Sequence, residues 1–290
     1  MKTIVNKLRD RSFYTLGRAA RAAIIAFFAV ALIAPASFVL IVPGDAQPLF
    51  PKVLKIEASK TSSQTPIASH PVNGQMYLLT IYVTNPDSWV FGGQVLACWI
   101  KQDCVAYPRS ILYQKNTSTK EEEKTGVAEM KGSQSDALRA ALSEVKLLEP
   151  TTNTSQITDK SVVVDIKDVG GPSGGLVFAL GLTDLLTTKD LAQGRKIAGS
   201  GTIDSSGGVG AIGGISEKII AARKAGASIL FASQDNCDEI PQKVSGITVV
   251  AISKLHEAVD YLAKPIANTK NSSVNIRDFK GVIGCTNLGA

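Results

Sequence analysis

A serine and a lysine, each near the start of an expected helix, could together carry out nucleophilic chemistry. Ser173 lies in the glycine-rich turn Gly171-Pro172-Ser173-Gly174-Gly175, and Lys218 follows the pair Gly213-Gly214. A lysine shielded from water loses its proton near neutral pH and can act as a base. A serine hydroxyl needs such a base to become a nucleophile. The two residues therefore predict hydrolysis, with Ser173 as nucleophile and Lys218 as base.

The turn around Ser173 also favours an oxyanion hole. Glycine adopts backbone conformations that other residues avoid, and it lets a substrate chain come close. An apolar helix is expected over 176–186, and its first N–H groups have no partner within the helix. We therefore expect the backbone N–H groups of Ser173 and Gly174 to stabilise an oxyanion. The alternative role for Ser173 is that of a simple helix N-cap.

The helix expected over 216–226 places Lys218 at the edge of its apolar face. That face consists of Ile215, Ile219, Ala222 and Gly226. Glu217 and Lys224 fall on the opposite side of the helical wheel, so we expect both to be solvated. A lysine at such an edge either lies buried or extends its ammonium group into water.

Two other functions stay open for the same residues. Ser173 also fits the pattern G-x-S-x-G, and Asp235 and His256 follow it in the order used by α/β-hydrolases. This arrangement would make the protein a His-dependent esterase, although it requires a parallel sheet built largely before the serine. The second alternative is a catalytically silent scaffold with the same fold.

The pattern of the remaining chain predicts an α/β or α+β fold with short strands and a buried helix after the nucleophile. The expected strands cover 53–58, 76–84, 161–166, 228–232 and 247–252, and the expected helices cover 133–145, 176–186, 216–226 and 255–263. Ser133 is the expected N-cap of the first of these helices. We expect an exposed loop over 116–125 and a hairpin formed by 196–204 and 209–212.

The N-terminal segment predicts a membrane anchor. Residues 1–21 form a basic, cytoplasmic segment, and residues 22–42 contain no charged side chain, which predicts a transmembrane helix. Basic residues before such a helix predict a cytoplasmic N-terminus and an extracytoplasmic remainder. A cleaved signal peptide is the alternative, because small residues follow at 34–37.

The expected domain organisation follows from this anchor. Residues 43–52 are predicted to be a linker, and residues 53–264 to be the folded domain, with a core at 162–264. The tail, 265–290, has no strong periodicity.

The composition argues against several classes of function. The formal net charge of +6 comes mostly from the first 21 residues, and no basic stripe interleaved with aromatics is present, so nucleic acid is not an expected partner. The match to G-x-G-x-x-G at 208–213 follows turn residues rather than a strand, so no dinucleotide cofactor is expected. The chain has no phosphate-binding loop for ATP. No cofactor is predicted.

Four cysteines remain, at positions 98, 104, 237 and 285. The chain has two histidines and no C-x-x-C pair, so we expect no metal site. In an oxidising compartment Cys98 and Cys104 could form a short-loop disulfide, and two thiols are the alternative.

The serine turn, the hairpin and the lysine helix together closely resemble the proteolytic domain of Lon-type peptidases. In that family a G-P-S-[AG]-G turn supplies the nucleophile and a G-G-x-x-x-K segment supplies the base. Ser173 and Lys218 match these positions and lie 45 residues apart, a separation typical of the family. Ser200 matches a Thr or Ser that would hydrogen-bond the amine. The resemblance implies a serine endopeptidase with a Ser–Lys dyad that acts on polypeptide substrates without a metal or ATP.

The resemblance extends beyond these motifs. Residues 130–137 are similar to the M-K-E-S-A-x-x-A helix start of the domain, and the expected anchor and residues 235–237 look like the membrane-anchored, ATP-independent Lon-like proteases of bacteria. Those relatives usually carry a PDZ domain where this chain has only 149–160, which is too short for one. Gly170 stands where ATP-dependent Lon proteins have an acidic residue. Lon-type domains often form rings, so the resemblance also implies self-association.

Overall fold

The computed structural model describes residues 17–56, 69–101, 103–166, 169–241, 243–264 and 282–285. The chain divides into two compact units. The N-terminal unit consists of the residues up to Ile41 together with Val83–Thr117. The larger unit consists of Val42–Tyr82 and the residues from Ser118 onward.

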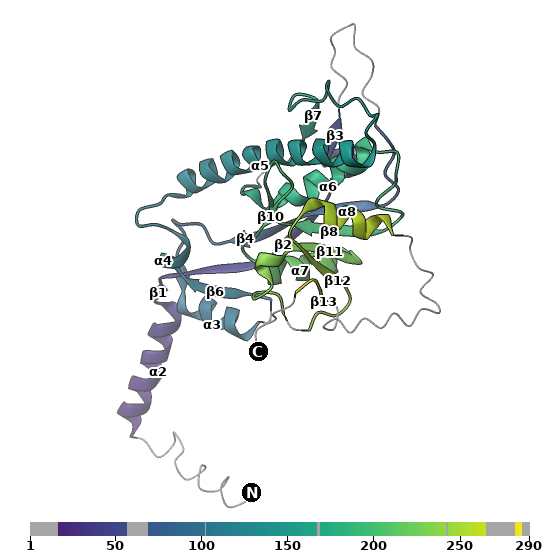
Figure 1. Ribbon diagram of the computed structural model, residues 1–290. Coiled ribbons are helices and arrows are strands. Elements are labelled where there is room, and N and C mark those ends of the chain that lie inside the picture. The colour runs from purple at the N-terminus through teal and green to yellow at the C-terminus, as the bar shows by residue number, and fades with distance from the viewer. Residues whose placement is uncertain are drawn as a thin grey trace, which may run out of the picture. The chain divides into compact units, whose positions relative to one another are not determined.

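A largely parallel sheet forms the centre of the larger unit (Figure 1). Its strands, in spatial order, are β13 (Val282–Ile283), β12 (Thr248–Ile252), β11 (Ile229–Ser233), β8 (Lys196–Ser200), β4 (Gln75–Val83) and β2 (Phe38–Pro48). Every pairing from β13 to β4 is parallel. The carboxyl ends of these strands therefore lie at one edge of the sheet.

Helices cover both faces of this sheet (Figure 1). They are α5 (Thr119–Leu148), α6 (Gly175–Leu186) and α8 (Leu255–Ala263) on one face and α7 (Ile215–Lys224) on the other. Successive strand residues point to opposite faces, so Ile197 packs on the side of α6 whereas Ala198 packs on the side of α7. The mixed α/β fold predicted from the sequence is confirmed.

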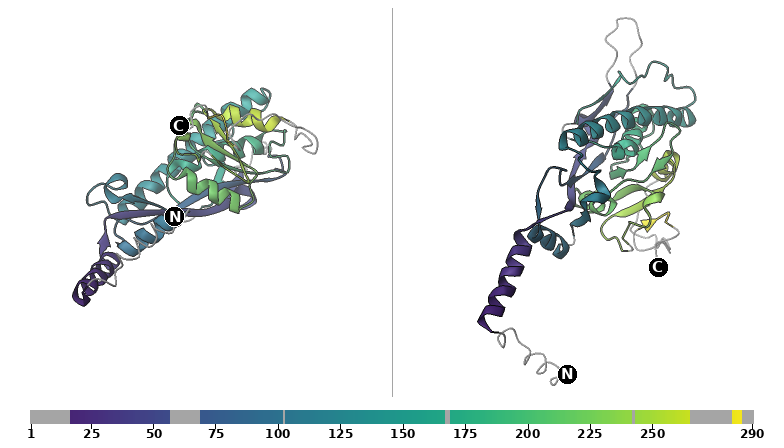
Figure 2. Two further views of the ribbon diagram at one scale, coloured as in Figure 1. Left: turned by 90° about the horizontal axis from the view of Figure 1, so that it is seen from below. Right: turned by 90° about the vertical axis from the view of Figure 1, so that its left-hand side faces the viewer.

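Helix α6 is buried on all sides because nearly all of its residues are apolar or small. Eleven of its twelve residues are buried, as the sequence predicted for the helix after the nucleophile. The buried half of α5 lies along it through Ala137, Ala141 and Val145 (Figures 1 and 2). The start of α6 is consequently held within the core.

Helix α5 begins well before the predicted position. The N-terminus is closed by a capping box in which Ser118 Oγ accepts the Glu121 N–H at 3.3 Å and Glu121 Oε2 accepts the Ser118 N–H at 3.0 Å. The exposed loop predicted over 116–125 is therefore largely wrong, and so is the prediction of Ser133 as an N-cap. Ser133 lies in the middle of the helix and is buried.

Long-range pairing changes two other predictions. The expected hairpin is divided, because β8 joins the central sheet and β9 (Thr202–Ile203) alone pairs with β10 (Val209–Gly210). The segment predicted as a linker, 43–52, is instead ordered: β2 continues to Pro48, and a turn, η2 (Leu49–Val53), follows it with a buried Leu49.

A second, two-stranded pairing precedes the serine turn. It joins β3 (Leu54–Ile56) to β7 (Val162–Val164) in antiparallel register.

Most of the tail predicted from residue 265 lies outside the described residues. Its described part contains β13, which pairs with β12, and Cys285, which forms a disulfide with Cys237.

The N-terminal unit contains mostly short elements. They are α2 (Arg18–Ile33), β1 (Pro35–Ala36), β5 (Val90–Phe91), α3 (Gly92–Ile100), β6 (Val105–Pro108) and α4 (Arg109–Leu112). The first residues of β2 pair antiparallel with β6, and β1 pairs antiparallel with β5.

Only residues 22–33 of the range predicted as a transmembrane helix, 22–42, are helical. Helix α2 ends at Ile33, and Pro35 and the residues after it are extended, since proline cannot continue the helical hydrogen bonds. Val39 is instead a buried strand residue opposite Tyr107. Across the part of the chain that the structure describes, we find no helix with both the length and the apolar character that a membrane crossing needs. Residues 1–16 of the predicted basic segment lie outside that part.

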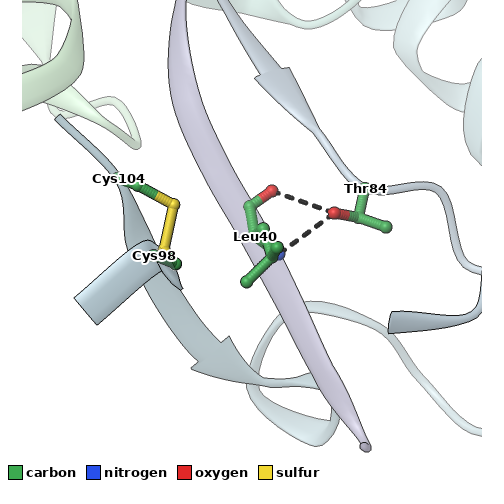
Figure 3. Close-up of a disulfide and its surroundings, with 4 residues drawn as sticks. All are labelled: Leu40, Thr84, Cys98 and Cys104. Atoms are coloured by element: carbon green, nitrogen blue, oxygen red, sulfur yellow. Dashed lines mark hydrogen bonds between the residues drawn. A yellow bond between two sulfur atoms is a disulfide. The ribbon is translucent and has the colours of Figure 1, made fainter. Parts of the chain in front are cut away.

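Figure 3 shows the disulfide between Cys98 and Cys104, which connects the end of α3 to the segment before β6. The sequence had left this pair open between a disulfide and two thiols. Nearby, Thr84 Oγ1 accepts the Leu40 N–H at 3.1 Å and donates to the Leu40 carbonyl at 3.2 Å. The second disulfide, Cys237–Cys285, was not predicted, because it requires the tail to return to the sheet.

Candidate active site

Ser173 lies in a short 3-10 turn, η3 (Pro172–Gly174), directly before α6. Gly171 enters the turn with a φ of 87°, a conformation that favours glycine. Pro172 then fixes its own φ, and the Gly175 N–H donates to the Pro172 carbonyl. The glycine-rich sequence thus folds into a tight turn that presents a half-buried Ser173 beside the core.

Lys218 lies in the first turn of α7 and is 2% exposed. Its Nζ lies 2.8 Å from Ser173 Oγ and 3.1 Å from Ser200 Oγ. Ser200 is the last residue of β8 and is fully buried. The three predicted side chains therefore meet at the carboxyl end of β8, between the helix layers of α6 and α7.

Burial governs the charge of the Lys218 amine. Loss of hydration lowers the pKa of Lys218 from its ordinary value of 10.5 to about 7. The two contacting groups, from Ser173 and Ser200, are neutral hydroxyls, so neither supplies a negative charge to hold the proton. A large fraction of the amine is therefore neutral near pH 7.

The backbone of the serine turn is fixed from the sheet side. The Ser173 carbonyl accepts the Gly201 N–H at 3.0 Å and the Ser200 hydroxyl at 3.3 Å. Ser200 therefore contacts both the amine of Lys218 and the backbone of Ser173. Gly174, the other residue predicted to donate to an oxyanion, follows in the same turn and is buried.

The exposure of Glu217 differs from the prediction. It is 4% exposed rather than solvated, and burial raises the pKa of its carboxyl group. The helical wheel assumed one buried side, whereas a second segment approaches the first turn of α7, where Ser216 Oγ donates to the Glu239 carbonyl at 3.0 Å. Lys224 is exposed, as predicted.

The residues of the alternative triad do not form a catalytic pair. His256 Nδ1 lies 2.7 Å from Glu144 Oε1, and His256 Nε2 lies 3.4 Å from Asp260 Oδ2. Asp235 lies in η4 (Gln234–Asn236), where its N–H donates to Ser233 Oγ. Both ring nitrogens of His256 thus face carboxylates other than Asp235.

The sequence assigned no role to Asn236, and the only role that it assigned to Ser133 was that of a helix N-cap. Asn236 is 1% exposed, and its amide accepts the Ile212 N–H at 3.0 Å and donates to the Ile212 carbonyl at 2.8 Å. It thereby fixes the segment that leads into α7. Ser133 donates to the Pro172 carbonyl at 2.9 Å. Both lie in segments that match the Lon-type pattern, but the pattern does not say what they contact.

No group of three or more His, Cys, Asp or Glu side chains suited to a metal ion occurs within the described ranges. The functional groups at the candidate site are hydroxyls, one amine and backbone amides. This set can transfer protons and attack a carbonyl carbon.

Comparison with known proteins gives an independent result. Residues 125–264 match the family model for the Lon protease (S16) C-terminal proteolytic domain. A search of curated proteins found no match. The matched range runs from the first half of α5 to the end of α8, and it includes Ser173, Ser200 and Lys218. Residues 125–264 therefore form a Lon-like protease domain, the proteolytic module of a family of serine peptidases.

Proposed function

We propose that the protein is a serine endopeptidase that cleaves polypeptide substrates through a Ser173–Lys218 dyad without ATP. One observation carries this proposal: the amine of Lys218, buried and with a pKa lowered to about 7, lies 2.8 Å from the Ser173 hydroxyl. A general base must lie within hydrogen-bonding reach of the proton that it removes and have a pKa near the working pH.

In the proposed mechanism, neutral Lys218 takes the hydroxyl proton as Ser173 Oγ attacks the peptide carbonyl carbon. The resulting ammonium group gives this proton to the leaving amine when the C–N bond breaks, which leaves an ester on Ser173. Water then attacks the ester and passes a proton to Lys218. The bond to Ser173 Oγ breaks, and the serine regains its proton from the lysine.

Ser200 acts as an orienting residue for the amine. Its own proton is donated to the Ser173 carbonyl, so its oxygen can accept an N–H of Lys218. This contact directs the lone pair of the neutral amine toward the Ser173 hydroxyl. The N–H groups of Ser173 and Gly174 are the proposed oxyanion donors.

The dyad is tested by comparing full-length variants on unfolded casein, with peptide products measured by mass spectrometry. We expect Ser173→Ala and Lys218→Met each to lower the rate by at least about a thousandfold. The matched control is Lys224→Met, an exposed lysine on the same helix, which should keep the wild-type rate. Added ATP and magnesium should not change the rate. Wild-type rates in both dyad variants would refute the proposal.

We also propose that the domain works outside the cytoplasm. Two disulfides, Cys98–Cys104 and Cys237–Cys285, support this location, because disulfides persist in oxidising compartments. Alkylation of rapidly acid-quenched cells tests it. All four cysteines should react only after reduction, and labelling without reduction would contradict the proposal. Self-association, implied by the resemblance, stays a prediction.

Contact with a membrane surface through α2 is a further part of the proposal. No residue of α2 is buried, and Phe27 is 69% exposed. Both tryptophans of the chain belong to the same unit and are largely exposed, Trp89 by 72% and Trp99 by 65%. Exposed apolar helices and tryptophan side chains are typical of the lipid–water interface.

Flotation of the full-length protein with vesicles of phosphatidylethanolamine and phosphatidylglycerol tests this contact. We expect the double substitution Phe27→Asp and Phe28→Asp to lower the bound fraction about tenfold. Leu147→Asp, which changes an exposed leucine on α5, is the control and should bind like wild type. Equal flotation of all three proteins would exclude α2 as the contact.

A further inference from the structure

Ser133 contacts the serine turn from outside it. The residue lies in the middle of α5, is 5% exposed, and donates its hydroxyl to the Pro172 carbonyl at 2.9 Å. A serine inside a helix often bonds a carbonyl of the preceding turn of its own helix, but Ser133 donates to a different element. Glycine at position 175 permits the contact, because a Cβ there would lie 2.5 Å from Ser133 Oγ.

This hydrogen bond fixes the direction of a peptide group. The C=O and N–H of a planar trans peptide point in opposite directions, so a fixed Pro172 carbonyl also fixes the Ser173 N–H. The Gly175 N–H donates to the same carbonyl, but it belongs to the turn and moves with it. Ser133 is held by α5, which lies beside α6 (Figure 1), and it therefore gives the peptide an external anchor.

The next peptide group is anchored from the opposite side. The Ser173 carbonyl accepts the Gly201 N–H and the Ser200 hydroxyl, which fixes the N–H direction of Gly174. The Gly171 N–H also donates to the Gly126 carbonyl of α5 at 2.8 Å. The peptide groups on both sides of Ser173 are thus oriented by elements outside the turn.

We propose that Ser133 is a positioning residue that orients the Ser173 N–H as a donor of the oxyanion hole. This role rests on the proposed Ser173–Lys218 hydrolysis. Without the anchor, nucleophile and base stay within reach of each other, but one donor to the developing negative charge is turned away. The loss should therefore appear in turnover, and neither substrate binding nor the pKa of Lys218 should change.

The experiment compares full-length Ser133→Ala with Ser135→Ala on a quenched fluorescent peptide. Ser135 lies on the same helix, and its hydroxyl donates to Asp159 at 3.0 Å, away from the turn. For Ser133→Ala we expect kcat to fall about 10- to 100-fold, with KM changed less than about threefold. The midpoint of the pH profile should not move. Inhibition by a peptide aldehyde, whose adduct places an oxyanion in the hole, should weaken by the same factor as kcat/KM. Ser135→Ala should match wild type in all four measurements.

Several outcomes would overturn the role. One is a kcat of Ser133→Ala within about twofold of the control, and another is a loss accompanied by a shifted pH midpoint, which would mean that Ser133 acts on Lys218. If Ser133→Ala does not fold, Ser133→Cys replaces it, since a thiol is similar in size but a weak donor, and Ser133→Thr should restore turnover. A wild-type protein without turnover would refute the proposed function itself, before any variant is compared.

Discussion

At the scale of single residues, two of the ionisable groups that the larger unit buries, Lys218 and Asp184, respond to pH in different ways. Lys218 is buried beside two hydroxyls, and its pKa is lowered. Asp184, on α6, is 2% exposed, and burial raises the pKa of its carboxyl group to about 6. Its Oδ1 accepts the Leu191 N–H at 2.7 Å, whereas its Oδ2 has no partner among the described residues.

Asp184 makes stability depend on pH in a direction opposite to that of a salt-bridged carboxylate. The Asp184 carboxyl group holds its proton more tightly in the folded state than in the unfolded state. Its contribution to stability is therefore greatest below the ordinary pKa of Asp and is lost as pH rises through about 6. The loss should be at most about 3 kcal/mol. Asp184→Asn should remove most of this dependence, as measured by urea unfolding at pH 4.5 and pH 8. Identical pH dependence in variant and wild type would contradict this account of Asp184.

His256 should matter for stability rather than for catalysis. Its hydrogen bond to the buried Glu144, together with the charge of that carboxylate, raises the pKa of His256. The stabilisation is complete below the ordinary pKa of histidine and is lost as pH rises through the raised value. We expect His256→Ala to keep the wild-type rate of hydrolysis and to lower the Tm more at pH 6 than at pH 9. Loss of hydrolysis in this variant, with activity kept in Lys218→Ala, would favour the alternative triad.

At the scale of elements, the position of α7 depends on Asn236. Its amide satisfies both backbone groups of Ile212, shortly before the helix that carries Lys218. Asn236→Ala would leave two buried backbone groups unpaired, which should cost about 2–4 kcal/mol and lower kcat through displacement of α7.

Asp235→Ala, which changes an exposed neighbour in η4, is the control for Asn236→Ala. Urea unfolding and peptide kinetics measure both effects. If the two variants are equally stable and active, the segment before α7 does not depend on Asn236.

The elements near the site were largely predictable from local patterns. The turn at Ser173, the buried helix after it and the lysine helix follow from glycine positions and apolar periodicity, and the structure has all three. The start of α5 was also encoded locally, since Ser118 and Glu121 form a recognisable capping box, and the prediction missed it. The helix predicted over 22–42 runs past the end of α2, because the lack of charged residues continues to residue 42 whereas Pro35 cannot continue the helical hydrogen bonds.

At the scale of the whole molecule, the sequence could not supply contacts between distant segments. The burial of Lys218 depends on packing that a helical wheel does not include, and its two hydroxyl partners come from β8 and η3. The division of the expected hairpin depends on β8 pairing with β4 and β11. The Cys237–Cys285 disulfide depends on the tail returning to β12. Local sequence patterns predicted the serine turn and the lysine helix, but not the strand pairing that brings Ser173, Ser200 and Lys218 together.

The most direct measurement of the central claim is the rate at which Ser173 is acylated by an activated peptide ester, as a function of pH. Intact-protein mass spectrometry of the full-length chain follows the acyl-enzyme. Because the base must be unprotonated, we predict a rate that rises with pH through a midpoint of about 7, set by Lys218. Lys218→Met should lack this rise and react at least about a thousandfold more slowly. An acylation rate and midpoint that are the same in wild type and Lys218→Met would contradict the account.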